Sequence, residues 1–177
     1  MHNKKRPNIG RFFFALNCAN FQKMSNSDLT TKEIERKLQY YCSYQDRCHK
    51  EVVSKLKTFN INIQNSNQII SNLIRDDYLN ESRFSKSFVR GKFNFKNWGK
   101  IRITNELKRR NISSYNINHG LKEIDEKDYE QKLEELFTKK LSSLSKLTSF
   151  EKKKKIISYL LYRGWESNLI YSKINEI

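Results

Sequence analysis

A short pattern recurs at nearly equal spacing along this chain, and it constrains the fold more than any other feature. Leu56–Ile61 (LKTFNI), Leu107–Ile112 (LKRRNI) and Leu160–Trp165 (LLYRGW) each place a leucine four residues before Asn or Gly and five before a large apolar residue. Successive copies are separated by 51 and then 53 residues. A period of this length indicates tandem repeats that stack their hydrophobic faces on one another.

Each copy of the pattern predicts the end of a helix, a tight turn and the start of another helix. Asn and Gly tolerate the left-handed backbone that closes a helix, and the apolar residue after them completes the turn with a hydrophobic contact. The residues expected to be left-handed are Asn60, Asn111 and Gly164, and those expected to make the closing contact are Ile61, Ile112 and Trp165. Polar clusters suited to begin the next helix follow at Gln64, Ser113 and Glu166.

The spacing of apolar residues predicts a further helix upstream of each copy. Its markers are Leu38, Tyr41, Tyr44 and Gln45 in the first unit, Phe84 and Phe88 in the second, and Leu133, Leu136, Phe137 and Leu141 in the third. The chain has one proline and five glycines, so little interrupts a helix. We therefore expect an all-α protein of three tandem three-helix repeats, at residues 32–80, 81–125 and 126–177, packed into an elongated, curved array.

Residues 1–31 differ from the rest of the chain. They begin with a basic stretch, continue with a five-residue apolar patch from Phe12 to Leu16, and then become polar. A secretory signal needs an apolar stretch of roughly 7 to 15 residues, so we favour a disordered arm or an upstream extension. Met24 is an alternative start, because the segment that follows carries its own helix-capping residues.

The net charge of +16 and the pI near 9.8 limit the class of partner. Such a basic protein is suited to nucleic acid, an acidic protein surface or an anionic membrane. No apolar run approaches the roughly 18 residues of a membrane span, so we expect a soluble protein without a membrane partner. Cys18, Cys42 and Cys48 are too few for a disulfide framework, and we expect small buried side chains in a reducing cytoplasm.

The positive charge is concentrated in the middle repeat. Residues 81–112 hold ten Lys or Arg and two acidic residues, which supplies half of the chain's net charge. The ten are Arg83, Lys86, Arg90, Lys92, Lys96, Lys100, Arg102, Lys108, Arg109 and Arg110. We expect this block to contact DNA phosphates or acidic residues of a partner protein, with a solvated face as the alternative. On a helix starting near Gly99, Arg102 and Arg109 share one face and would reach one partner together.

Other features have a structural interpretation. The aromatic residues among these cations are Phe84, Phe88, Phe93, Phe95 and Trp98, for which we favour core packing over stacking on bases. The stripe expected to be buried on the helix near Gly99 consists of Trp98, Ile101, Thr104 and Leu107. The run Lys152–Lys155 fits a solvated helical turn better than a phosphate site.

No enzymatic chemistry is indicated. The histidines, at positions 2, 49 and 119, are far apart, and the Cys48–His49 pair lacks the second pair that a metal site needs. Asp76 and Asp77 are adjacent and so point to different helix faces, and there is no Gly-rich phosphate loop. We therefore expect a non-enzymatic protein without a cofactor or metal.

Three segments together resemble a known family. They are YYCSYQDRCHKEVVSKL (40–56), FVRGKFNFKNWGKIRITNELKRRNI (88–112) and YLLYRGWESNLI (159–170). In this order and spacing they are similar to the bacterial regulatory protein RecX, in a Bacteroidetes-like version. The resemblance covers about residues 32–177. Asn111 stands where many members have Gly, which the left-handed turn tolerates.

The resemblance implies a function. RecX proteins fold as three tandem three-helix repeats, bind the recombinase RecA along its filament on DNA, and modulate recombination, usually by inhibition. It therefore implies a monomeric regulator in the cytoplasm whose partners are the RecA filament and DNA, reached directly or through the filament. A stand-alone basic helical module that binds DNA or RNA is the alternative.

Overall fold

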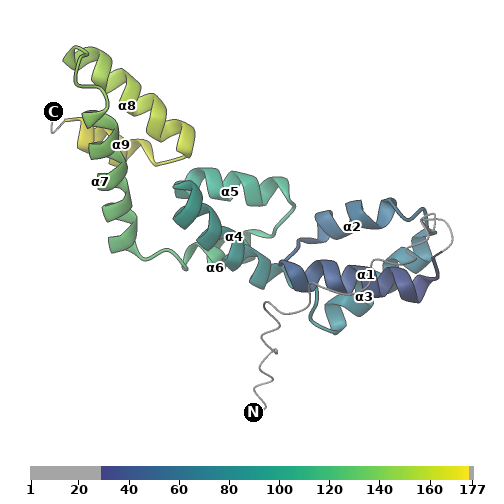
Figure 1. Ribbon diagram of the computed structural model, residues 1–177. Helices are drawn as coiled ribbons and strands as arrows, with labels where there is room; N and C mark the ends of the chain where they lie inside the picture. Colours follow the sequence, from purple (N-terminus) through teal and green to yellow (C-terminus); the bar gives the residue numbers. More distant parts are fainter. Residues whose placement is uncertain (1–28, 176–177) are drawn as a thin grey trace, which may run out of the picture.

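The computed structural model describes residues 29–175 of the 177-residue chain, and every regular element in that range is a helix. The helices are α1 (Thr31–Tyr44), α2 (His49–Lys57), α3 (Ile63–Arg75), α4 (Glu81–Lys96), α5 (Lys100–Arg109), α6 (Ser114–Leu121), α7 (Glu126–Ser142), α8 (Ser149–Arg163) and α9 (Ser167–Ile174) (Figure 1). The arm predicted for residues 1–31 lies outside the described residues apart from its last three.

The helices between residues 29 and 175 form three groups of three along an elongated, bent array (Figure 1). We call α1–α3 repeat 1, α4–α6 repeat 2 and α7–α9 repeat 3. Repeats 1 and 3 lie at opposite ends with repeat 2 between them. The all-α helical-repeat fold expected from the sequence is confirmed. The division into domains at 32–80, 81–125 and 126–177 stays a proposal.

Side-chain caps begin most of these helices. Thr30 and Thr148 begin α1 and α8 with capping boxes. In each box the threonine hydroxyl accepts a hydrogen bond from the backbone N–H of the glutamate three positions later, and the carboxylate of that glutamate accepts one from the threonine backbone N–H. Single caps of the same kind begin four further helices, at Asn62, Asn80, Ser113 and Asp125. Each cap satisfies amide groups that the helix leaves unpaired, which typically stabilises a helix by about 1 kcal/mol.

The turns that end α5 and α8 match the repeated pattern. Asn111 has a φ of 60° and Gly164 a φ of 78°, so both are left-handed as predicted. In each turn the following residue donates its backbone N–H to the leucine that opens the pattern. These bonds run from Ile112 to Leu107 and from Trp165 to Leu160, each with an N···O distance of 3.2 Å. Both apolar residues are buried, so the closing hydrophobic contacts are confirmed.

The first copy of the pattern closes differently. Asn60 is left-handed with a φ of 52°, but α2 ends at Lys57 and the turn is wider. Phe59, not Ile61, is the buried residue. The left-handed residue is therefore as predicted, and Ile61 is half-buried and packs against the core of repeat 1 beside the more deeply buried Phe59.

Two predicted stripes have the wrong register. On α1 the buried residues are Ile34, Leu38 and Cys42, while Tyr44 is exposed. On α5 they are Ile103 and Leu107, while Ile101 is exposed. The cause is the same in both helices, because a stripe built from steps of three drifts around a helix of 3.6 residues per turn, whereas steps of four stay close to one face.

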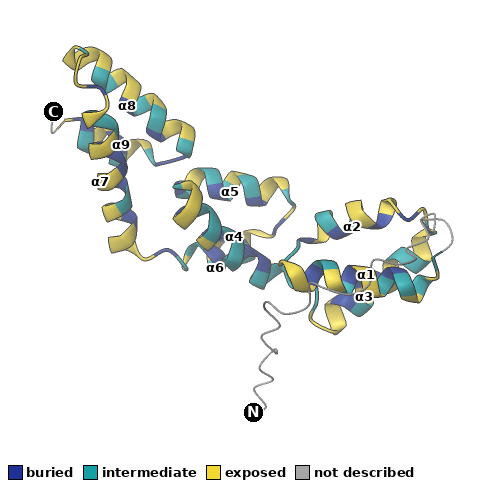
Figure 2. Cartoon of the chain, in the orientation of Figure 1, coloured by how far each residue is buried: buried dark blue, intermediate teal, exposed yellow. Residues whose placement is uncertain are grey.

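The buried residues form two separate cores. One lies within repeat 1 and contains Leu38, Leu56 and Leu73. The other runs continuously through repeats 2 and 3 and takes only Cys48 from repeat 1. Figure 2 shows the buried residues as narrow stripes on the sides of the helices that face one another. Repeats 2 and 3 are therefore one hydrophobic unit, to which repeat 1 is joined mainly by polar contacts.

The junction between repeats 2 and 3 is an end-to-end contact of two helices. The backbone N–H groups at the start of α5 donate to carbonyls at the end of α8, from Gly99 to Arg163 at 2.9 Å and from Ile101 to Gly164 at 3.1 Å. Each helix end thus satisfies unpaired backbone groups of the other, and the positive end of one helix dipole meets the negative end of the other.

Tyr129 of α7 fixes the same junction from the side. Its hydroxyl accepts from the backbone N–H of Lys100 at 2.9 Å and donates to Glu166 at 2.6 Å. Its ring stacks on Trp165 with a centroid separation of 4.4 Å, and the Trp165 indole N–H donates to the carbonyl of Asn97 at 3.3 Å. Burial and the bond to Glu166 raise the pKa of Tyr129 well above its ordinary value, so the hydroxyl stays a donor.

Replacement of Gly99 by alanine tests this close contact. A Cβ at Gly99 would lie 2.5 Å from the carbonyl carbon of Gly164 and 2.6 Å from the backbone nitrogen of Trp165, whereas nothing lies within 4 Å of a Cβ at Gly91. We expect Gly99→Ala to lower the free energy of unfolding by about 2 kcal/mol or more. Gly91→Ala should leave it unchanged or raise it by up to about 1 kcal/mol, since alanine favours a helix. Urea unfolding followed by circular dichroism measures both, and a Gly99→Ala variant as stable as the wild type would contradict the expected clash.

The buried thiol of Cys42 predicts a loss of stability at alkaline pH. Burial raises its pKa from 9.0 to about 11, so the unfolded chain releases the proton first. The contribution to stability is complete below pH 9.0 and is lost as the pH rises towards 11. Between those limits we expect wild type to lose up to about 2 kcal/mol more than Cys42→Val. Urea unfolding of both proteins across this range measures the difference, and parallel curves would contradict the assignment.

Candidate functional site

Six of the ten cations predicted for the site form ion pairs within the protein. The pairs are Arg83 with Asp46 and Asp77, Lys86 and Arg90 with Glu123, Lys100 with Glu126, and Arg109 and Arg110 with Glu106, at N···O distances between 2.6 and 3.3 Å. Most of these acids lie outside residues 81–112, in the flanking segments. Four carboxylates from outside residues 81–112 therefore halve, in space, the local excess of eight positive charges read from the sequence.

Arg83 is the clearest structural member of the ten. Its guanidinium donates to the carboxylate of Asp46 at 2.8 Å, to the carboxylate of Asp77 at 2.7 Å and to the backbone carbonyl of Asp77 at 2.8 Å. Ser87 donates to the other oxygen of Asp46 at 2.6 Å. These bonds tie α4 to the end of α1 and to the link after α3, so Arg83 holds repeats 1 and 2 together.

Arg102 and Lys92 lie over aromatic rings. The guanidinium of Arg102 is 4.2 Å from the ring centroid of Trp98 and 4.7 Å from that of Tyr162, and it donates to the carbonyl of Tyr162 at 2.8 Å. Lys92 lies 5.1 Å from the rings of both Phe88 and Trp98. Arg102 is thus part of the junction between repeats 2 and 3. These contacts disfavour the prediction that Arg102 and Arg109 reach one partner together.

Four members of the ten, two of them already named as ion-paired, face outward. Lys96 and Lys108 are exposed and make no ion pair with any described residue. The Arg109 side chain is 74% exposed and that of Arg90 is 53% exposed, although each touches a carboxylate. Exposed ion pairs of this kind contribute little to stability, so a partner can replace them at small cost.

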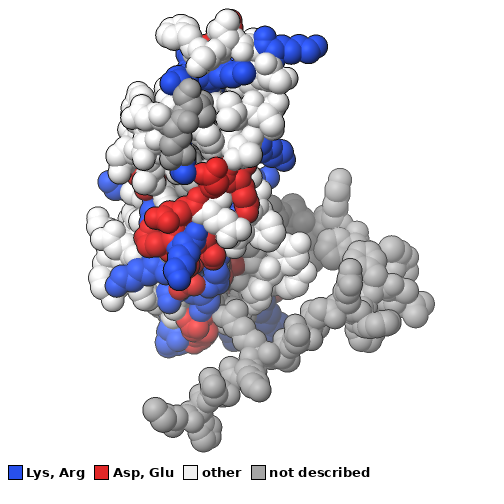
Figure 3. All heavy atoms as spheres, turned by 90° about the vertical axis from the view of Figure 1, so that its left-hand side faces the viewer, with Lys and Arg blue, Asp and Glu red and all other residues white. Residues whose placement is uncertain are grey.

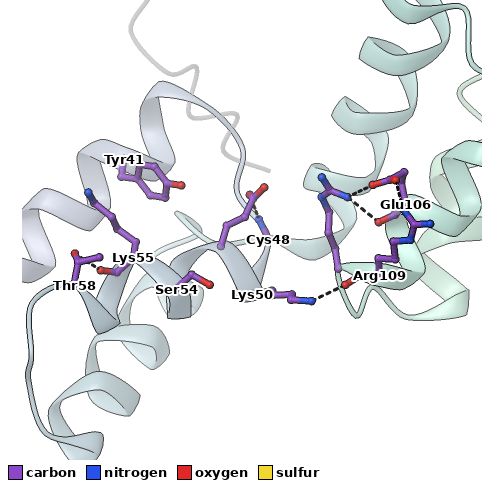
Figure 4. A pocket seen from close by; sticks show the side chains of 10 residues that line it. Tyr41, Cys48, Lys50, Ser54, Lys55, Thr58, Glu106 and Arg109 are labelled. Atoms are coloured by element: carbon purple, nitrogen blue, oxygen red, sulfur yellow. Dashed lines mark hydrogen bonds and ion pairs between the residues drawn. The ribbon is translucent and has the colours of Figure 1, made fainter.

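Two hollows lie beside these residues at the junction of repeats 1 and 2. The first, of about 560 Å³, is lined by Lys50 and Lys55 of α2 and by Glu106, Arg109 and Arg110 around the end of α5 (Figure 4). The second, of about 600 Å³, lies between the end of α1 and the outer side of α4. We call the two together the junction cleft.

The second hollow of the junction cleft is walled by aromatic and basic side chains. Tyr44 and Phe95 are 78% and 83% exposed there, and Lys92 and Lys96 lie beside them. Arg110 lines both hollows and is shared between them. The cleft can therefore hold an extended, acidic segment of a partner, with aromatic rings available for packing.

The cations of α2 were missed by sequence reasoning. Lys50 donates to the backbone carbonyl of Arg109 at 2.8 Å and so bridges the two repeats (Figure 4). Lys55 lines the same hollow. Repeat 1 has a small net charge, which hid these lysines, although their places on the polar face of the HKEVVSKLK helix were a usable signal.

The aromatic residues of repeat 2 divide between core and surface. Phe84 and Phe93 are buried, and Phe88 and Trp98 pack against the same core, so core packing is confirmed for these four. Phe95 is 83% exposed and lines the junction cleft, so the packing prediction is wrong for this residue. It follows Phe93 by two positions, and residues two apart point to different sides of a helix.

The carboxylates are held in their charged form by the cations beside them. A hydrogen bond from Arg110 lowers the pKa of Glu106, and one from Arg90 lowers the pKa of Glu123. Figure 3 looks onto the side of the molecule where repeat 3 lies, and acidic side chains gather in its middle with Lys and Arg around them. This face is of mixed charge, as is the junction cleft, where Asp46, Glu51 and Glu106 lie among the cations.

The described residues offer neither a metal-binding cluster nor a membrane-spanning helix. Among residues 29–175 no three His, Cys, Asp or Glu side chains lie close enough to hold a metal ion. None of the helices in that range has the length and apolar character needed to cross a bilayer. Cys42 and Cys48 are buried free thiols with pKa values raised by burial, whereas Cys18 lies outside the described residues.

The fold and this cleft define an elongated all-helical repeat protein with a charged groove at the junction of repeats 1 and 2. Models of the RecX second and third three-helix domains match residues 80–121 and 128–174. The chain belongs to the RecX family of bacterial regulatory proteins.

Individual relatives agree with this assignment. The chain is 27% identical to Regulatory protein RecX of Oceanobacillus iheyensis over 78% of its own length and 51% of that protein. The corresponding protein of Finegoldia magna is 30% identical, over 71% of this chain and 62% of the relative. The chain thus spans between half and two thirds of the length of these curated relatives.

Solved structures show the same fold. The crystal structure of RecX from Lactobacillus salivarius superposes with a TM-score of 0.73 at 27% identity, covering 82% of this chain and 95% of that one. A second crystal structure, of a regulatory protein RecX, gives 0.70 at 20% identity over 83% of this chain. The three-repeat array is therefore a shared architecture.

The division of the ten cations into structural and outward-facing residues predicts different effects on stability. Arg83→Met leaves Asp46 partly buried without its partner, so we expect it to lower the free energy of unfolding by about 2 kcal/mol. Lys108→Met removes an exposed charge and should change it by no more than about 0.5 kcal/mol. Urea unfolding of both variants measures the contrast. Equal stabilities would mean that the Arg83 network does not hold the repeats together.

Proposed function

We propose that this chain regulates the RecA recombinase by binding along the RecA filament on DNA, and that it inhibits recombination and DNA-dependent ATP hydrolysis. Membership of the RecX family is the observation that carries this proposal. The elongated array supports it, because a row of repeats suits a ligand that is itself a repeating polymer.

The junction cleft is the surface that we assign to the filament. Its outward-facing cations Lys96 and Arg109, together with the exposed Lys108 next to Arg109 in the chain, can pair with acidic residues of a recombinase or with DNA phosphates. The other predicted residues support this surface from inside the protein. Arg83 and Arg110 fix its walls, so they act on binding through the geometry of the cleft.

Binding of the chain would inhibit the recombinase because the chain covers part of the filament surface. A protein lying along the filament covers places that the incoming duplex or the next recombinase subunit needs. It therefore blocks strand exchange or limits filament growth without any chemical step. On this proposal the protein is a non-enzymatic monomer that works in the cytoplasm, where RecA acts on DNA.

Inhibition of the cognate recombinase is the direct test. The chain in stoichiometric amounts should lower DNA-dependent ATP hydrolysis and strand exchange by RecA on single-stranded DNA. The triple variant Lys96→Glu, Lys108→Glu and Arg109→Glu should need at least about tenfold more protein for the same effect, because it reverses three outward-facing charges.

A matched control separates this cleft from overall charge. Lys127, Lys139 and Lys146 are exposed residues of repeat 3, and their replacement by Glu changes the net charge by the same amount. This variant should inhibit like the wild type. Unchanged RecA activity with the wild-type chain would reject the proposed function, and equal losses in both triple variants would reject the cleft.

A stand-alone module that binds DNA or RNA is the alternative function. It predicts strong binding to naked nucleic acid that weakens steeply with salt, without any recombinase. The neutralisation of most cations in repeat 2 by internal carboxylates disfavours this role for the middle repeat. Cations without ion pairs to any described residue, which such binding needs, lie along α8 of repeat 3.

A further inference from the structure

A hollow on repeat 3 holds an uncompensated group of cations. It lies along α8 and the end of α7, has a volume of about 600 Å³, and is lined by Lys140, Lys154, Lys155, Arg163, Tyr159 and Tyr162. We call it the α8 hollow. Figure 3 shows Lys and Arg side chains at the end of the molecule formed by repeat 3, apart from the acidic group in the middle.

The charge of the α8 hollow is not neutralised from within the protein. None of its four cations forms an ion pair with a described residue, in contrast to six of the ten cations of repeat 2. One carboxylate, Glu151, lines the hollow, but it accepts from the backbone N–H and hydroxyl of Thr148 at 3.0 and 2.8 Å as part of the α8 cap. Lys155 also helps to lower the pKa of Glu151, but four positive charges face this single carboxylate, so the hollow keeps an excess of positive charge.

Two of these cations are held in place by one ring. The guanidinium of Arg163 lies 3.9 Å from the ring centroid of Tyr159, and the ammonium of Lys140 lies 5.2 Å from it. The Nε of Arg163 is buried without a hydrogen-bond partner among the described residues. A guanidinium that is already ordered by stacking loses little entropy when an anion binds to its accessible nitrogens.

Tyr162 adds an aromatic surface to this cationic group. Its ring is 71% exposed, and Arg102 lies over one face at 4.7 Å from the centroid. Arg102 also donates to the Tyr162 carbonyl, so repeat 2 fixes the position of this tyrosine. Because Tyr162 is mostly exposed although Arg102 lies over its ring, ring surface remains available for a flat ligand.

We infer that the α8 hollow binds single-stranded DNA, with phosphates on Lys154, Lys155 and Arg163 and a base stacked on Tyr162. Unpaired cations that follow a backbone, beside an exposed aromatic ring, are the combination that binds single strands. An acidic peptide would use the cations but has no need for the open face of Tyr162. Duplex DNA keeps its bases stacked on one another and cannot use the ring either.

Fluorescence anisotropy of a labelled oligothymidylate with the full chain, and no recombinase, tests this inference. Lys154→Ala with Lys155→Ala should weaken binding at least tenfold, and the slope of log K against log salt should fall by about 0.7 for each lost phosphate contact. Tyr162→Ala should weaken binding severalfold without changing that slope. Circular dichroism confirms that each variant is folded.

The control comes from the same lysine run. Lys152→Ala with Lys153→Ala removes the same charge from the same helix, but neither residue lines the hollow. It should bind within about twofold of the wild type. Equal weakening of both double variants, no effect of Tyr162→Ala, equally tight binding of duplex, or no binding at low salt would each overturn the inference. Because no recombinase is present, these outcomes leave the proposed function untouched.

Discussion

The end-to-end contact of α5 and α8 is the interaction on which the arrangement of this protein depends. Gly99 and Gly164 let two backbones approach to hydrogen-bond distance, and N–H groups of one helix end pair with carbonyls of the other. Tyr129 and Trp165 then lock the angle between repeats 2 and 3. These two repeats share one core, whereas repeat 1 has a core of its own and is joined to them mainly by polar contacts.

The local charge around each part of this protein depends on which acidic and basic side chains lie close together in the fold, not on which are close in sequence. Repeat 2 is the most basic segment of the sequence, yet Asp46, Asp77, Glu123 and Glu126 reach it from both flanks. The near-neutral repeat 3 keeps its acids on and around α7, so the cations of the α8 hollow stay unpaired. Arg83, Lys100 and Arg102 of repeat 2 bond to the neighbouring repeats, and we propose that the cations left outward-facing mark where a partner binds.

Much of the fold followed from the sequence, because a left-handed Asn or Gly and the residue after it are local requirements of the chain. On that ground it was possible to predict the turns at Asn111 and Gly164 and the helical repeats that they close. The spacing of apolar residues likewise indicated the buried sides of α7 and α8. The register of α1 and α5, the exposure of Phe95 and the role of Arg102 were not. The registers and the exposure of Phe95 were missed because residues two or three apart were assigned to one helix face. The contact of Arg102 with Tyr162 joins residues 60 positions apart, which no local pattern encodes.

Binding to the RecA filament is the central claim of this account, and co-sedimentation measures it most directly. RecA assembled on single-stranded DNA with a slowly hydrolysed nucleotide is pelleted in the presence of the chain. The account predicts that the chain pellets with the filament in a saturable ratio, and that it pellets far less with RecA lacking DNA. A chain that stays in the supernatant while the filament pellets would contradict it.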